Sequence, residues 1–241
     1  HDVHGDALVL LVASHPDDRY VLPAVWLRRS RGARVAVLLA SRGGGGQNSQ
    51  GPETGDELER IRTLEAEAGC SRFGAEVWYL DRPDRGFRRT AGETFSEWGR
   101  EESVREMARL LRTIRPDVVL STHHAEETHG HDLALAAMLP EAVVLAANPN
   151  ALPQWPAHQV QSLFLGATSS PAAVSFVLHT DEIDVDSGDI EVISPMGGAI
   201  TGPDDLALKM TPSGPDQVGD WRLKLYVTQG AVTLSRALPV L

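Results

Sequence analysis

The sequence predicts an α/β fold, in which a doubly wound, mostly parallel, Rossmann-like sheet is followed by a β-rich C-terminal appendage. Continuous apolar runs recur along the first 150 residues, and each has the length of a strand that is buried on both faces. Amphipathic segments of helical period separate these runs. Beyond residue 150, clusters of Pro, Gly, Ser and Asp separate short β-rich runs. Strands that alternate with helices imply right-handed crossovers between parallel strands.

The elements of the core can be placed in order. Apolar runs predict four strands, at Ala7–Ala13, Arg34–Ala40, Glu76–Leu80 and Asp117–Leu120. Apolar residues at helical spacing predict helices at Tyr20–Arg29, Leu58–Ala68, Val104–Ile114 and Leu133–Met138. Pro140 is expected to bend or reset the last helix, because proline lacks the backbone N–H. We therefore expect residues 1–150 to form the core.

Residues 151–241 are expected to form a β-rich extension that borders the active site. Its short β-rich runs are Leu163–Gly166, Ala173–Leu178, Ile190–Ile193 and Leu223–Thr228. Specificity often resides in such additions. We therefore expect this extension to select the larger part of the substrate.

Composition excludes several classes of protein. The 241 residues are 42% hydrophobic and 23% charged, which suits a sizeable core and excludes disorder. The net charge of -11 disfavours nucleic acid and anionic membranes as partners. No apolar run reaches the roughly 18 residues of a membrane span, and neither a signal nor a transit peptide is evident, so we expect a cytoplasmic protein. The single cysteine, Cys70, excludes a zinc site built from several thiolates.

Polar residues follow each predicted strand, at the edge where ligands bind in open parallel sheets. After the first strand, His15 and Asp18 are three residues apart, and an imidazole with a carboxylate suits a zinc-like ion. Asp17 lies between them and should point elsewhere, as expected of a base beside a metal-bound water. The alternative is that Asp17 or Asp18 caps the following helix. Four of the nine histidines lie between residues 123 and 131, after the fourth strand, and would complete a metal site.

Several motifs resemble the PIG-L/LmbE-like zinc-dependent N-acetylglucosaminyl deacetylases. They are His15-Pro16-Asp17-Asp18, Ser41-Arg42-Gly43-Gly44, Arg62-Thr63-Leu64-Glu65, Pro83-Asp84 and Arg115-Pro116-Asp117-Val118-Val119. The resemblance covers about residues 7 to 145 and implies one zinc ion per chain. The acidic, Arg- and Ala-rich chain with a β-rich tail looks most like the lipoglycopeptide-antibiotic branch.

The resemblance implies roles for individual residues. It places His15 and Asp18 on the metal, with Asp17 as the general base. The family's second motif is His-x-x-His, whereas this chain reads His129-Gly130-His131-Asp132. We expect His131 to be the third ligand and His129 to polarise the substrate carbonyl. His129 and Asp132 remain alternatives for the third ligand.

The resemblance also implies substrate contacts from Arg62, Asp84, Gly43 and Gly44. The glycine-rich loop that contains Gly43 follows the second strand and matches no nucleotide-binding pattern. A cofactor other than the metal is therefore not expected.

The function expected from these residues is hydrolysis of the N-acetyl or N-acyl amide of a glucosamine-containing substrate. That substrate would be a small molecule or a glycopeptide-antibiotic precursor. The alternative is a catalytically silent carbohydrate-binding protein of the same fold, since the second histidine motif is irregular. A metal phosphoesterase would need more carboxylates than this edge of the sheet offers.

Overall fold

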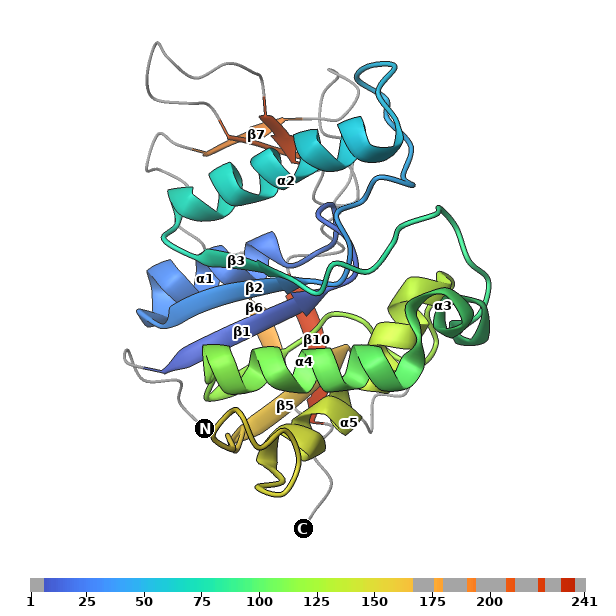
Figure 1. Cartoon of the computed structure of the whole chain (residues 1–241). Helices are drawn as coiled ribbons and strands as arrows, with labels where there is room; N and C mark the ends of the chain where they lie inside the picture. The colour runs from blue at the N-terminus through green and yellow to red at the C-terminus, as the bar shows by residue number, and fades with distance from the viewer. Residues whose placement is uncertain are drawn as a thin grey trace.

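The computed structural model describes residues 7–166 and five further strands within residues 176–236 (Figure 1). Five parallel strands form the central sheet, in the order β3-β2-β1-β4-β5. Their bounds are Leu8–Ala13 for β1, Arg34–Leu39 for β2, Glu76–Tyr79 for β3, Val118–Leu120 for β4 and Ser162–Gly166 for β5. This arrangement confirms the predicted doubly wound α/β fold.

The sheet continues past residue 150. β5 pairs in parallel with β4, and the antiparallel strands β10 (Ala231–Arg236) and β6 (Phe176–His179) follow it. A separate antiparallel sheet contains β7 (Ile190–Ile193), β8 (Ala207–Met210) and β9 (Trp221–Leu223). The predicted strands of the extension thus coincide with or overlap β5, β6, β7 and β9. Most of the extension lies outside the described residues, so its place beside the active site stays a prediction.

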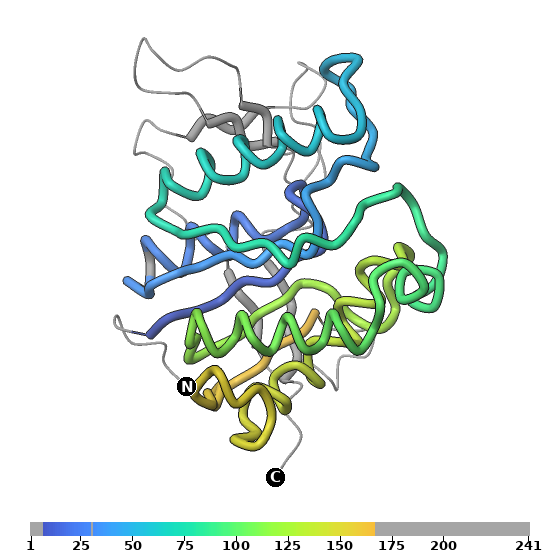
Figure 2. Tube along the Cα trace, viewed as in Figure 1, coloured from blue at the N-terminus to red at the C-terminus, as the bar shows by residue number. Residues whose placement is uncertain are grey.

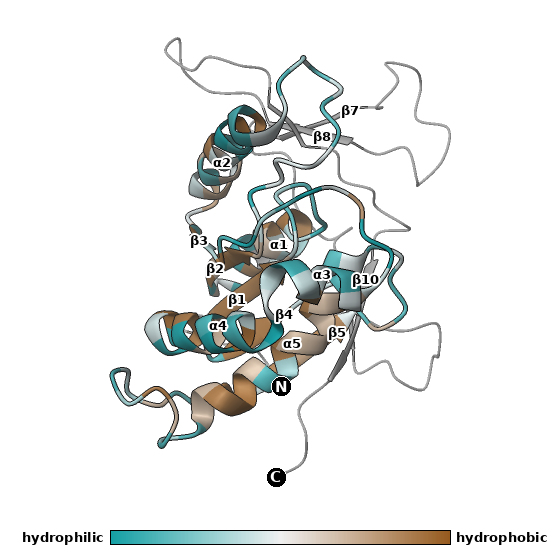
Figure 3. Cartoon of the chain, turned by 45° about the vertical axis from the view of Figure 1, so that its right-hand side comes forward, coloured by the Kyte–Doolittle hydropathy of each residue, from teal (hydrophilic) through white to brown (hydrophobic). Residues whose placement is uncertain are grey.

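Helices cover both faces of the sheet (Figures 1 and 2). One face packs against α1 (Val21–Arg31) and α2 (Gly55–Arg72). The other face packs against α3 (Ala91–Trp98), α4 (Arg100–Ile114) and α5 (Gly130–Ala147). Successive residues of β1 face opposite layers, since Val9 and Leu11 belong to the first core and Leu10 and Val12 to the second. β1 and β4 are accordingly apolar at every position, which Figure 3 shows for β1.

The last helix of the core, α5, is longer than expected. It extends from Gly130 to Ala147, and Pro140 lies inside it without ending it. Burial against α3, α4 and the sheet compensates for the backbone hydrogen bond that proline cannot donate. By length and composition α5 could cross a membrane, but 56% of it is buried within the protein, as in a core helix.

Buried Arg112 of α4 holds the C-terminal end of α5. The residue is 3% exposed, and its guanidinium donates hydrogen bonds to five backbone carbonyls at 2.5–3.3 Å. Those carbonyls belong to Leu145, Ala146, Asn148, Leu152 and Trp155. Four of these carbonyls also accept from a backbone N–H, so the guanidinium adds a second, charged donor at the end of α5 and in the loop that follows it.

Candidate metal centre and active site

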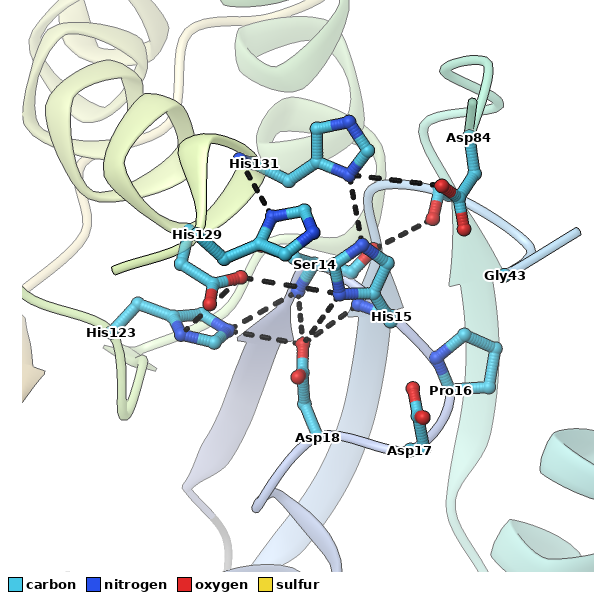
Figure 4. Close-up of polar contacts among 12 residues, drawn as sticks. Ser14, His15, Pro16, Asp17, Asp18, Gly43, Asp84, His123, His129 and His131 are labelled. Atoms are coloured by element: carbon cyan, nitrogen blue, oxygen red, sulfur yellow. Dashed lines mark hydrogen bonds and ion pairs between the residues drawn. The ribbon is translucent and has the colours of Figure 1, made fainter. Parts of the chain in front are cut away.

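The candidate site lies at the carboxyl ends of β1 and β4 (Figure 4). These two strands are neighbours at the point where the strand order reverses, which is where open α/β sheets bind ligands. β1 ends at Ala13 and leads into the turn that contains His15 and Asp18. β4 ends at Leu120 and leads into the histidine-rich segment before α5. The topology thus joins segments more than a hundred residues apart.

Asp18 fixes the turn that follows β1. Its Oδ2 accepts hydrogen bonds from the backbone N–H groups of Ser14 at 2.8 Å and His15 at 2.7 Å. The N-cap of α1 is Tyr20, and no side chain supplies its capping hydrogen bond. Neither Asp17 nor Asp18 is therefore the helix cap considered above.

His15 presents its two ring nitrogens to different partners. Its Nδ1 lies 3.7 Å from Asp18 Oδ2 and 4.0 Å from Asp132 Oδ1. Its Nε2 lies 2.8 Å from Nδ1 of His131, which is hydrogen-bond distance. The imidazole therefore separates two carboxylates on one side from a second imidazole on the other.

His123 lies between the same two carboxylates. Its side chain is 7% exposed, its Nε2 is 3.1 Å from Asp18 Oδ2, and its Nδ1 is 3.8 Å from Asp132 Oδ1. The Nδ1 also lies 3.6 Å from Glu127 Oε1. From the sequence, His123 is as compatible with an exposed or packing role as with a role in orienting another ligand. Its position directly after β4 was the signal for a closer role.

The start of α5 brings the second motif to the site. His129 is the N-cap residue, and its Nδ1 accepts from the backbone N–H of His131 at 3.1 Å. His131 is fully buried and packs against the ring of Trp98 with centroids 4.8 Å apart. Gly130 lets this end of the helix approach another loop closely, since a Cβ there would lie 2.4 Å from the carbonyl oxygen of Thr90.

Two groups of three side chains have the composition of a metal site. One is His15, Asp18 and Asp132, and the other is His15, His129 and His131; within each group the ligand atoms lie within 4.8 Å of one another. Asp132 Oδ1 and His131 Nε2 are buried and have no hydrogen-bond partner among the described residues. Imidazoles and carboxylates in this arrangement suit a zinc-like divalent cation. The residues therefore fit the metal that the sequence predicts.

The carboxylates set the charge of His15 and His123 in the metal-free protein. Burial by itself lowers the pKa of His15, but hydrogen bonding to Asp18 and the charges of Asp18 and Asp132 raise it to about 9. Burial likewise disfavours the charged form of His123, yet Asp18, followed by Glu127 and Asp132, raises its pKa to about 10. The two imidazoles in turn hold the pKa of Asp18 well below its ordinary value, although burial opposes this. Without an ion, the protons on these imidazoles balance the carboxylate charge.

The pKa values of His131, His129 and Asp132 shift so as to favour the neutral form of each group. Burial, then the nearby charge of His15, lowers the pKa of His131 to about 3. The same two causes lower the pKa of His129. Burial raises the pKa of Asp132, against the effect of His123. His131 is therefore neutral, which suits either a metal ligand or a hydrogen-bond partner of one.

Asp17, the predicted base, lies apart from the candidate ligands. Figure 4 shows it next to Pro16, outside the network of polar contacts that joins Asp18 to the histidines. Its side chain is 66% exposed, and its Oδ2 is 3.9 Å from Arg62 Nη2. An exposed carboxylate beside the cluster can exchange protons with water and substrate.

Arg62 shapes the glycine-rich loop. Its guanidinium donates to the carbonyl oxygens of Gly43 at 2.8 Å and Gln47 at 3.0 Å. Gly43 has φ +76, and a Cβ there would lie 2.8 Å from Arg62 Nη1. The backbone of the buried Gly44 accepts from the N–H of Gly55. The structure thus brings Arg62, Gly43 and Gly44 together on one side of Asp17.

Asp84 lies behind the site. Its side chain is 3% exposed, and its Oδ1 accepts from the backbone N–H of Gly86 at 2.9 Å and lies 4.0 Å from His131 Nδ1.

The adjacent loop presents Phe87, a residue that sequence reasoning missed. Phe87 is 62% exposed, and its ring meets that of His129 edge-on with centroids 5.1 Å apart. An exposed aromatic ring thus adjoins the site.

The sequence matches the family described as PIG-L: GlcNAc-PI de-N-acetylase over residues 10–143. That span exceeds half of the 241 residues and includes each candidate site residue named above.

Three solved structures share the fold. N,N'-diacetylchitobiose deacetylase from Pyrococcus horikoshii, solved with its inhibitor MPG, has 19% identity and a TM-score of 0.58 over 71% of this chain and 63% of its own. This chain therefore spans less than two thirds of that protein. A conserved protein from Thermus thermophilus has 25% identity and a TM-score of 0.54, with 71% of each chain covered. 4-Carboxy-2-hydroxymuconate hydratase from Pseudomonas putida has 21% identity and a TM-score of 0.56, with 73% of each chain covered. One fold thus carries both a deacetylase and a hydratase, so the reaction must be argued from the site.

Proposed function

This chain belongs to the PIG-L family, and from that membership we propose that it is a metal-dependent hydrolase acting on the N-acyl amide of a glucosamine unit. The observation that carries the proposal is the cluster of His15, Asp18 and the first residues of α5 at the ends of β1 and β4. The family description and the chitobiose deacetylase both concern removal of an acyl group from an amino sugar. The cluster offers the donors that such a reaction would require.

The metal would be held by His15, Asp18 and a third side chain from the start of α5. A bound divalent ion supplies two effects, a lower pKa for a water molecule and polarisation of the amide carbonyl. Zinc is our proposal for the ion, because the donors are imidazoles and carboxylates.

Asp17 is the proposed general base. Its exposed carboxylate would accept a proton from the attacking water and return it to the departing amine. Because Asp17 lies outside the network around Asp18, it can act on protons without being a ligand.

His129 is the proposed partner of the substrate carbonyl. It caps α5 through Nδ1, which leaves Nε2 to donate toward the negative charge that develops on the carbonyl oxygen.

Arg62 and the backbone of Gly43 and Gly44 are the proposed substrate contacts beside Asp17. Asp84, with its side chain buried, would contribute by holding the loop that carries Phe87.

The finer identity of the substrate stays a prediction. A glycopeptide-antibiotic precursor is the more specific hypothesis, and a small N-acylated glucosamine is the general one. The cytoplasmic location likewise stays a prediction.

The test is turnover with and without metal. The full chain, stripped with a chelator and reloaded with zinc, should release free amine from N-acetylglucosaminyl substrates, and the stripped protein should not. Full activity without metal would contradict the mechanism. Sugar binding without turnover in the zinc-loaded protein would favour the catalytically silent alternative.

A further inference from the structure

We propose that this chain binds its divalent ion through His15 Nδ1, Asp18 Oδ2 and Asp132 Oδ1, and that His131 orients His15 from the opposite side of the ring. This donor set contains a carboxylate where the imidazole of His131 is expected from the sequence, and it selects Asp132, one of the two alternatives for the third ligand. The inference rests on the metal-dependent part of the proposed function.

The two candidate donor sets use opposite nitrogens of His15. The Nδ1 atom faces both carboxylates, whereas Nε2 faces His131. An imidazole binds one ion through one nitrogen and usually donates a hydrogen bond from the other. The question is therefore which side of this ring has room for an ion.

On the Nε2 side the separation is that of a hydrogen bond. Nε2 of His15 and Nδ1 of His131 are 2.8 Å apart. Two nitrogens on one tetrahedral zinc, each about 2.0–2.1 Å from the metal, lie about 3.3 Å from each other. A proton on His15 Nε2, donated to His131, accounts for the observed contact. Nδ1 is then the nitrogen that loses its proton and offers a lone pair when an ion binds.

On the Nδ1 side the separations leave space for an ion. Nδ1 lies 3.7 Å from Asp18 Oδ2 and 4.0 Å from Asp132 Oδ1. These distances exceed a hydrogen bond, yet all three atoms could reach an ion at about 2.1 Å from each after small adjustments. Asp132 Oδ1 is buried without a hydrogen-bond partner among the described residues, as expected of an oxygen that a cation would satisfy.

Charge and local structure support the same set. Two carboxylates match the charge of a divalent ion, whereas three imidazoles leave it uncompensated. His131 is fully buried against Trp98, so its ring is fixed on the far side of His15. Asp132 is the next residue of the first turn of α5 and points toward His15 Nδ1 and His123.

The decisive measurement is the number of imidazoles on the bound metal. X-ray absorption spectra of the zinc-loaded full chain should show one imidazole and otherwise oxygen ligands, and the same count should hold in His131→Asn. A second imidazole that disappears in His131→Asn, or in His123→Asn, would overturn the assignment.

Metal affinity gives an independent readout. Asp132→Asn keeps the side-chain shape and should weaken zinc binding by more than about 100-fold, measured by competition with a chelator. In His131→Asn, the new side chain can still accept the hydrogen bond from His15. This substitution should weaken zinc binding by about 10- to 100-fold, the usual range for a residue that orients a ligand. Circular dichroism would show whether each variant folds, and the parent spectrum decides the assignment if one does not.

The outcomes separate this inference from the proposed function. A protein that turns over substrate only with zinc, but carries two imidazoles on the ion, contradicts the donor set alone. A protein that binds no ion, yet hydrolyses the amide, contradicts both.

Discussion

At the scale of single residues, the turn after β1 assigns different tasks to neighbouring carboxylates. Asp18 is tied to two backbone N–H groups and to His123, whereas Asp17 is exposed beside Arg62. Position alone would thus separate the proposed metal ligand from the proposed general base, although the side chains are chemically identical.

Asp17→Asn tests this division. Asparagine keeps the shape but cannot accept the proton, so turnover should fall by about 10²- to 10⁴-fold while zinc occupancy stays near that of the parent. Steady-state kinetics and metal analysis measure the two effects. Normal turnover would remove Asp17 as the base, and loss of zinc would mean that Asp17 is a ligand.

Phe87 should contribute to substrate binding rather than to chemistry. Its exposed ring, edge-on to His129, can cover the apolar face of a sugar or an acyl group. Phe87→Ala should raise KM several-fold and leave kcat within about twofold. Leu64, also exposed but on α2, provides a control, since Leu64→Ala should change neither constant. An unchanged KM in Phe87→Ala would show that the ring is outside the substrate's reach.

The sequence could predict the first motif but not which residue of the second motif binds the ion. His15 and Asp18 share one short turn, so their proximity follows from their spacing. His129, His131 and Asp132 lie where an extended chain becomes a helix, and each step along a helix turns the side chain by about 100°. A shift of one residue therefore brings a different donor to the site.

At the scale of secondary structure, α5 carries the second motif at one end and is held by Arg112 at the other. Replacing Arg112 with Met would remove five hydrogen bonds that a buried charged group donates, although four of the five carbonyls keep a backbone N–H donor. Hydrogen bonds of charged groups contribute roughly 1.5–3 kcal/mol each. We expect Arg112→Met to lower the free energy of unfolding by at least about 3 kcal/mol, measured by urea denaturation.

The control for this prediction lies on the same helix. Arg105 of α4 is exposed, and Arg105→Ala should change the free energy of unfolding by no more than about 0.5 kcal/mol. Equal effects of the two substitutions would show that the carbonyl contacts of Arg112 contribute little.

Prediction of elements was most accurate where the apolar pattern was continuous. The strands β1 to β4 were predicted to within one residue at each end, because their positions face two cores. α3 was missed, since it is only eight residues long. Its signal was Thr90 followed by Glu93, the residue types of a capping box. Thr90 Oγ1 accepts from the N–H of Glu93, and the Glu93 carboxylate accepts from the N–H of Arg89, the residue before the N-cap.

At the scale of the whole molecule, the doubly wound sheet was predictable because crossovers between parallel strands have one hand. Membership of β5 in that sheet was not evident, since the boundary was placed from a change in composition. Pairing between distant strands is decided by packing, which composition does not encode.

The stability of the whole metal-free protein should decline in alkali. The pKa values of His15 and His123 are raised from 6.5 to about 9 and 10, so their protonated forms stabilise the fold below about pH 6.5. This stabilisation is lost as the pH rises through 9 to 10. We therefore expect the Tm of the metal-free protein to fall over this range, measured by scanning calorimetry.

Zinc should stabilise the protein more as the pH rises, because ligand imidazoles must lose their protons before they bind the ion. The increase in Tm that zinc produces should grow from pH 6 to pH 8. His123→Asn should flatten the alkaline decline of the metal-free protein. A decline as steep in this variant as in the parent would show that other groups cause it.

The two segments that meet at the ends of β1 and β4 are held together by the folded sheet and by the contacts of His15 with His131 and of Asp18 with His123. An ion bound by Asp18 and a residue of α5 would therefore act as a reversible cross-link that closes a loop of more than one hundred residues. Closing so long a loop removes a large part of the conformational entropy of the unfolded chain, as a disulfide does. An ion that serves the chemistry would then also stabilise the fold, and its removal would make the chain more susceptible to proteolysis.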